Sequence, residues 1–215
     1  MNVDPTGHGF WDAFLNVVAA VAVVVVVTAA VVATAGVAAW AVGASATVIS
    51  AVTTGAAIGG IAAGTSEIVS QCITEGAEKL DIGAVAIETF IGSAHGVVDG
   101  IAATTGSVGV RLMCKVSKVT LSGLQATMHS VNNGDTASKM KSNIAKSMAG
   151  GVVVQGALIG FDRITGKLST SVLESLLIDG ALQYGAKQRN LTGAIRIISN
   201  IWRNKSRIRN AIFKE

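Results

Sequence analysis

The residues best suited to acid–base chemistry are His95 and Asp99, which lie four positions apart and would share one face of a helix. A histidine and a carboxylate at this spacing can share a proton, as general acid–base catalysis requires. The pair can also be a polar contact to a partner helix or to water, and this structural interpretation is favoured over catalysis. In a helix that enters a bilayer, the two would instead line a polar pathway, because ionisable groups in lipid are costly and usually functional.

The sequence offers little other chemistry. His8 and His129 belong to no HxxH, HNH-like or HxE…CxxC pattern, GxSxG is absent, and the nearest approach to a phosphate loop has Leu168 where Ser or Thr is needed. Cys72 and Cys114 have no metal-ligand spacing and are either two buried thiols or a disulfide. We therefore predict a protein that is not an enzyme and needs no cofactor or metal.

Glycines at four-residue spacing are the most regular pattern in the chain. On a helix this spacing makes a flat strip against which a second helix can pack closely. The glycines predicted to serve helix packing are Gly55, Gly59, Gly60, Gly64, Gly92, Gly96 and Gly100.

The element that must carry the first two strips is an uncharged stretch from Phe14 to Ser66. Crossing a bilayer takes roughly 20 apolar residues as a helix, and residues 17–42 alone exceed that length. Trp11 and Trp40 flank this part as an interfacial belt would. A short buried strand at 23–27 is the alternative, but no turn signal appears before residue 36. The stretch predicts two membrane-inserting helices, 10–42 and 44–64, with a break near Gly43.

The remainder predicts several Gly-rich amphipathic helices. Ser66-Glu67 resembles a helix start, and Thr136 can cap a helix. The other expected elements are helices over 83–100, 110–131 and from Thr136 through 152–161, a loop at Gly106 and Gly109, and polar turns at 132–135 and 162–167.

Charge divides the chain into an acidic half and a basic half. Residues 1–110 carry one cation and eight anions and so have a charge of −7. Because the whole chain has a net charge of +4, residues 111–215 have a charge of +11. The last segment, 187–215, holds eight cations, with Leu191, Ile195, Ile198 and Trp202 at helical spacing. A basic amphipathic helix with an apolar stripe favours a membrane surface over nucleic acid or a solvated face, and one aromatic gives base stacking little support. The predicted headgroup-binding residues are Arg196, Trp202, Arg203, Lys205, Arg207 and Arg209.

The run Val3-Asp4-Pro5-Thr6-Gly7-His8 resembles the sequence that closes the core of bacterial Rhs repeat-associated polymorphic toxins. A hydrophobic Ala/Val/Gly block, strings such as those at 160–167 and 176–180, and a basic tail are similar in layout to the toxin regions that follow that core. The boundary motif covers six residues, and the rest of the likeness is one of layout and short strings. The resemblance implies delivery into a competing cell and a cognate immunity protein.

We therefore expect an all-α chain with four regions: a boundary remnant at 1–9, a hydrophobic membrane-inserting hairpin at 10–64, a Gly-rich helical region at 65–186 and a basic amphipathic tail at 187–215. The expected function is a membrane-located, pore-forming or depolarising effector whose partners are the lipid bilayer, an immunity protein and further copies of itself. Two alternatives stay open. Residues 65–215 could be an enzymatic toxin that 10–64 anchors or translocates, or the chain could be an inert spacer.

Overall fold

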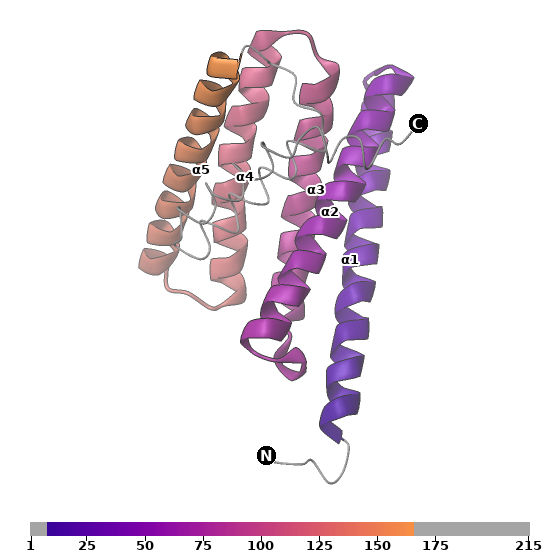
Figure 1. Cartoon of the computed structure of the whole chain (residues 1–215), viewed down its shortest axis with the longest axis vertical. Helices are drawn as coiled ribbons and strands as arrows, with labels where there is room; N and C mark the ends of the chain where they lie inside the picture. Colours follow the sequence, from indigo (N-terminus) through magenta and orange to yellow (C-terminus); the bar gives the residue numbers. More distant parts are fainter. Residues whose placement is uncertain (1–7, 166–215) are drawn as a thin grey trace. The chain divides into compact units, whose positions relative to one another are not determined.

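A computed structural model of the chain describes residues 8–165, and all regular structure within this range is helical. This confirms the predicted all-α class and its apolar N-terminal helix pair. Consecutive helices run in opposite directions (Figure 1), and α2 packs against both α1 and α3, while α4 packs against α3 and α5. The elements are α1 (His8–Ala41), α2 (Ala46–Thr74), the 3-10 turn η1 (Ala77–Lys79), α3 (Ile82–Thr104), α4 (Val108–Asn132) and α5 (Ala137–Thr165).

The predicted break between the two apolar helices is confirmed at residues 42–45. Gly43 has φ of +71°, a left-handed conformation that ends helices and suits glycine. Ser45 then caps α2, because its side-chain oxygen accepts a hydrogen bond from the backbone N–H of Val48. The connection of the apolar hairpin therefore forms because Gly43 ends the first helix and Ser45 caps the second.

The predicted helix start at Ser66 is wrong, because α2 continues without interruption to Thr74. Gly64 does not end the helix. A Cβ there would collide with the side chains of Thr89 and Val24, so this glycine serves close packing. Glu67, which was expected to begin a new helix, is buried and accepts a hydrogen bond from the buried Gln71 amide. The predicted boundary at 64/65 consequently falls inside one helix.

Two further boundaries differ from expectation. Gly109 lies in the first turn of α4 rather than in a loop, because Ser107 caps that helix through the N–H of Val110. Residues 162–165 belong to α5, so the turn predicted at 162–167 does not begin there. No glycine or proline stands between Asp162 and Gly166 to stop the helix. The predicted turn at 132–135 and the Thr136 cap of α5 are confirmed.

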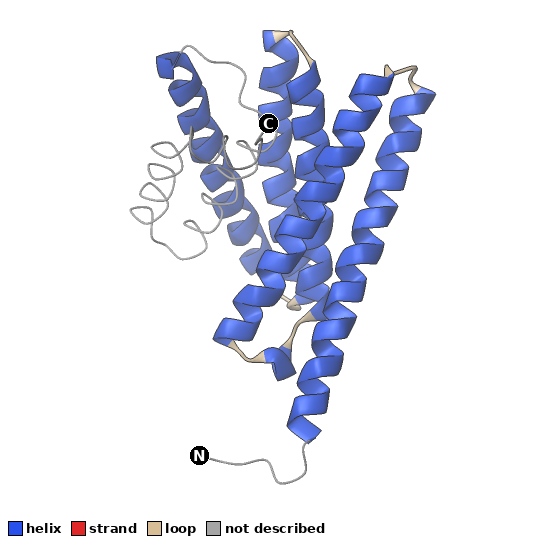
Figure 2. Cartoon of the chain, turned by 45° about the vertical axis from the view of Figure 1, so that its right-hand side comes forward, coloured by secondary structure: helices blue, strands red, loops and turns tan. Residues whose placement is uncertain are grey.

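The apolar core lies where α1, α2 and α3 meet. It is a small cluster of Ala20, Val24, Ile68 and Val85, against which Cys72, Leu80 and Ile82 pack. Figure 2 shows the described helices and the short loops between them from a second direction. The predictions for 1–7 and for the basic tail, including Arg196, Trp202, Arg203, Lys205, Arg207 and Arg209, lie outside the described residues.

Candidate functional site

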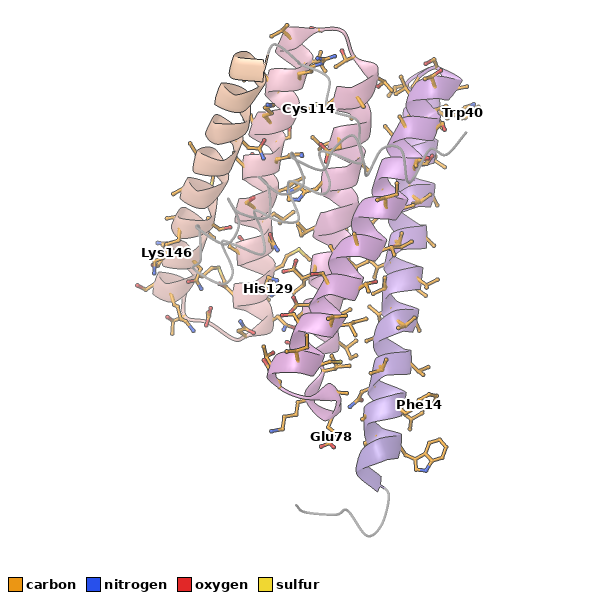
Figure 3. All side chains as sticks on the ribbon, viewed as in Figure 1. Phe14, Trp40, Glu78, Cys114, His129 and Lys146 are labelled. Carbon is orange, nitrogen blue, oxygen red and sulfur yellow. The ribbon has the colours of Figure 1, made fainter. Side chains whose placement is uncertain are left out.

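The outer face of α1 is the largest uncovered apolar feature of the described helices. Between residues 11 and 41, the buried residues are Ala20, Val24 and Thr28, one per helical turn. In the most apolar window of this helix, only 17% of the residues are buried. Figure 3 shows Phe14 and Trp40 toward opposite ends of α1. The exposed large side chains of this face are Trp11, Phe14, Leu15, Val18, Val21, Val25, Val26, Val37 and Trp40.

The second apolar helix buries its two longest polar side chains, while small hydroxyl side chains such as Thr47 and Ser50 are exposed. Glu67 and Gln71 are buried, whereas Ile61, Val69 and Ile73 are exposed. By length and composition α1 and α2 could each cross a membrane, and 28% of the most apolar window of α2 is buried. Unlike in a typical water-soluble bundle, large aliphatic side chains are therefore exposed along this hairpin while the acidic side chain of α2 is buried.

The glycine strips join helices of the same chain. A Cβ on Gly55 or Gly59 would run into the backbone carbonyls of Gly96 and Gly92 on α3, and the converse holds for a Cβ on either α3 residue. Gly100 continues the strip, since its Cβ would meet the carbonyl of Ala51. At this separation only glycine fits. The sequence predicted the strips, and the structure identifies α3, rather than α1, as the partner of the first α2 pair.

The second glycine pair of α2 faces hydroxyl side chains from two helices. Gly60 adjoins Thr28 of α1 and Ser93 of α3, and Gly64 adjoins Thr89 of α3. All three hydroxyl-bearing residues are buried, and the Thr89 hydroxyl donates to the carbonyl of Val85. Alpha-helical threonine commonly donates in this way. The interior between α1, α2 and α3 is therefore tightly packed and partly polar.

Asp99 forms a buried ion pair with α4. Its carboxylate is 2.7 Å from the Lys118 ammonium, and the two side chains are 7% and 8% exposed. Asp99 thus lies at the α3–α4 interface, with His95 buried one turn before it on the same helix. Sequence reasoning missed Lys118, although its four-residue spacing from Cys114 marked it as part of the same inward face of α4.

Cys114 and Cys72 are both free thiols, so the disulfide alternative is excluded. Burial raises the pKa of the Cys114 thiol, the Asp99 carboxylate raises it further, and the Lys118 ammonium partly offsets both effects. This thiol is therefore a poor nucleophile. In the part of the chain from 8 to 165, no cluster of three His, Cys, Asp or Glu side chains could hold a metal ion.

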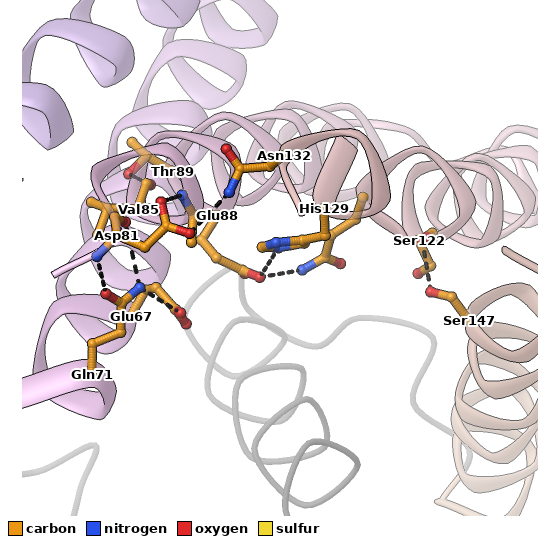
Figure 4. A network of polar contacts seen from close by, with 12 residues as sticks. Glu67, Gln71, Asp81, Val85, Glu88, Thr89, Ser122, His129, Asn132 and Ser147 are labelled. Carbon is orange, nitrogen blue, oxygen red and sulfur yellow. Dashed lines mark hydrogen bonds and ion pairs between the residues drawn. The ribbon is translucent and has the colours of Figure 1, made fainter. Parts of the chain in front are cut away.

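A polar network joins the ends of α2, α3 and α4 (Figure 4). The Gln71 side chain accepts from the backbone N–H of Asp81 at 2.6 Å, and Asp81 accepts from Asn132 at 2.9 Å. Two turns along α3, Glu88 lies 2.8 Å from His129 and accepts from Gln125 at 2.7 Å. His129 is thus held by a carboxylate of the adjacent helix.

The turn between α4 and α5 is held by Asp135. Its carboxylate binds Lys139 at 2.5 Å and accepts from the Asn143 amide at 3.0 Å. The hydrogen bond from Lys139 is the main reason why the pKa of Asp135 lies below the ordinary value of 3.8. These contacts fix the turn to the first turns of α5, and the Asn143 amide also donates to the Ser130 hydroxyl of α4 at 3.1 Å.

No protein-family model, curated protein or solved structure gives a significant match to this chain.

Proposed function

We propose that this chain is a membrane-inserting effector whose apolar hairpin, α1 and α2, enters a lipid bilayer and permeabilises it. The observation that carries the proposal is the outer face of α1. A helix with this composition would be mostly buried if it were the core of a water-soluble monomer, yet only 17% of its most apolar window is buried. Apolar surfaces of this extent are sites of membrane or protein association.

The position of the polar groups favours lipid over a protein partner. Thr28, Glu67 and Gln71 are buried in the helix bundle, and between residues 13 and 41 every exposed side chain of α1 except Thr34 is aliphatic or aromatic. A protein interface normally mixes polar groups and hydrogen bonds with its apolar centre. Hydrocarbon offers no partner to an unpaired polar group, and the exposed Thr34 hydroxyl already donates to the carbonyl of Ala30. The otherwise apolar face flanked by Trp11 and Trp40 therefore fits a bilayer and its two interfaces.

The effector part of the proposal rests on the sequence. The resemblance of Val3–His8 to the boundary of Rhs-associated toxins supports an interbacterial toxin, delivered to a target cell and neutralised by an immunity protein. Membrane damage is the activity that an inserting hairpin can deliver without a catalytic centre. Depolarisation of the target membrane is therefore the proposed outcome, and further copies of the chain are proposed partners in it.

The experiment combines vesicle flotation with dye release from vesicles of phosphatidylcholine and phosphatidylglycerol. The wild-type chain is expected to float with the vesicles and to release the dye. Val26→Lys places a charge at the middle of α1 on a side chain that is 66% exposed, so it leaves the helix packing intact. In a bilayer centre that charge costs about 2.5–3.5 kcal/mol, which should reduce vesicle binding about 50-fold or more.

Lys141→Met on the exposed face of α5 is the matched control, since it changes one lysine far from the hairpin and should leave both readouts unchanged. A chain that floats with vesicles but never releases dye contradicts permeabilisation. If Val26→Lys binds vesicles as well as wild type, α1 does not enter the bilayer. If the chain forms a stable dimer in water and Val26→Lys abolishes that dimer, the outer face of α1 binds a second copy of the chain rather than lipid.

A further inference from the structure

The two ends of the α1–α2 hairpin differ sharply in charge. The connection at residues 42–45 is uncharged, and no charged residue occurs from Phe14 to Ser66. The opposite end carries four carboxylates and one ammonium, from Asp12, Glu75, Glu78, Lys79 and Asp81. Asn16 of α1 donates to the backbone carbonyl of Glu78 at 3.0 Å, so the start of α1 and η1 lie at the same end.

Exposure singles out the uncharged end as the apolar tip. Trp40 is 75% exposed and Val42 is 82% exposed, so the hairpin presents two large apolar side chains at its turn. The Ser45 cap satisfies a backbone N–H of α2 there, which lowers the desolvation penalty of the turn. At the other end, the Asn132 amide donates to the Asp81 carboxylate, and both of these side chains are exposed to water.

From these observations we infer that the Trp40–Ser45 tip is the surface that enters the bilayer first and crosses to the far side, while η1 and the start of α1 stay on the side of addition. The inference rests on the proposed insertion of the hairpin and gives it a direction. In the reverse direction, the five charged side chains of the acidic end would have to cross the hydrocarbon core, which is energetically costly. The tip has no charged side chain that would have to cross. The cations Arg111 and Lys115 belong to α4, which is not one of the two apolar helices, so they are not part of the inserting hairpin.

Helix length agrees with this direction. From Ala46 to Ser66, α2 offers about 21 uncharged residues, a length of roughly 30 Å, which matches the thickness of the hydrocarbon core. With the tip at the far interface, Glu67 then reaches the near headgroup region. The uncharged part of α1 is longer and would fit by tilting.

The test uses single-cysteine chains in a Cys72→Ser, Cys114→Ser background. Val42→Cys reports on the tip, and Glu78→Cys, at an exposed residue of η1, reports on the acidic end (Figure 3). After flotation with the same phosphatidylcholine and phosphatidylglycerol vesicles, a membrane-impermeant maleimide is added outside or is sealed inside. We expect Glu78→Cys to react only from outside and Val42→Cys only from inside.

Outside labelling of Val42→Cys in floated vesicles, or protection of Glu78→Cys, overturns the direction while leaving insertion standing. Failure to float overturns both the inference and the proposed function. A charge at the tip gives a second readout. Ala44→Lys should slow dye release about tenfold or more, because the lysine must cross the bilayer, whereas Glu78→Lys should not. Equal rates for these two variants would also overturn the direction.

Discussion

Asp99 and Lys118 form an ion pair that is held almost completely out of water. Removing one member of a buried ion pair leaves an uncompensated charge, which typically costs about 3–5 kcal/mol. We therefore expect Lys118→Met to lower the free energy of unfolding strongly. Urea unfolding followed by circular dichroism in a mild detergent measures this effect.

The double variant Asp99→Asn, Lys118→Met should recover part of the loss, because it removes both charges. Lys141→Met on the exposed face of α5 should change the free energy of unfolding by less than about 0.5 kcal/mol. Equal effects of the buried and the exposed substitution would contradict the burial of the ion pair.

Asp135 makes one local contact dependent on pH. Its folded-state pKa lies below the ordinary value of 3.8, mainly because of the hydrogen bond from Lys139. The unfolded chain therefore takes up this proton at a higher pH than the folded chain. The stability from this contact is present above pH 3.8 and is lost as the pH falls through the folded-state pKa.

The measurement is the urea midpoint as a function of pH, compared between the wild-type chain and Asp135→Asn. The difference between the two midpoints should be constant above pH 3.8 and should shrink at lower pH. A difference that does not change with pH would mean that the Lys139 contact contributes no pH-dependent stability.

Among the helices, the α2–α3 contact is the one most sensitive to substitution. Gly59→Ala would push a methyl group into the backbone carbonyl of Gly92, which cannot move aside as a flexible side chain could. Overpacking of this kind typically costs about 1–3 kcal/mol. We expect a lower melting temperature, measured by circular dichroism in detergent.

Gly150→Ala is the matched control within α5. A Cβ at Gly150 would meet nothing within 4 Å, so alanine should stabilise that helix by roughly 0.5–1 kcal/mol through its higher helix propensity. Opposite signs for the two Gly→Ala changes are expected. A stabilising effect of Gly59→Ala would show that α2 and α3 do not approach as closely as their glycines indicate.

The sequence predicted local features well and long-range partners poorly. Gly43 and Thr136 marked a helix end and a helix cap because their roles depend on the adjacent backbone. The spacing of Gly55 and Gly59 predicted a packing strip, but which helix would fill it depends on contacts far apart along the chain. Lys118 was missed as the partner of Asp99 for the same reason. Ser66-Glu67 was wrongly predicted to start a helix because a glutamate is usually exposed to water. The sequence alone does not show that Glu67 is buried with Gln71 as its hydrogen-bond partner.

At the scale of the whole molecule, we expect vesicle association to resist salt. Electrostatic attachment through basic residues weakens at about 1 M salt, where the Debye length is roughly 3 Å, whereas an inserted apolar hairpin is unaffected. After incubation with phosphatidylcholine and phosphatidylglycerol vesicles, the chain should remain with them through a high-salt wash. Sedimentation of the washed vesicles measures this retention.

Release by salt would indicate surface attachment alone, as expected if the basic tail at 187–215 were the only membrane-binding element. Bovine serum albumin carried through the same incubation and wash is the negative control. The predicted roles of Arg196, Trp202, Arg203, Lys205, Arg207 and Arg209 stay predictions, and their replacement by glutamine would separate initial attachment from retention.

The glycine strips can pack against either a helix of the same chain or a helix of another copy, but not against both. Gly55 and Gly59 are occupied by Gly96 and Gly92 of the same molecule, with no space left for another backbone. A neighbouring copy could dock on these glycines only after α2 had released α3. Self-association through Gly55 and Gly59 is therefore incompatible with the α2–α3 contact of the monomer, because both would use the same glycines.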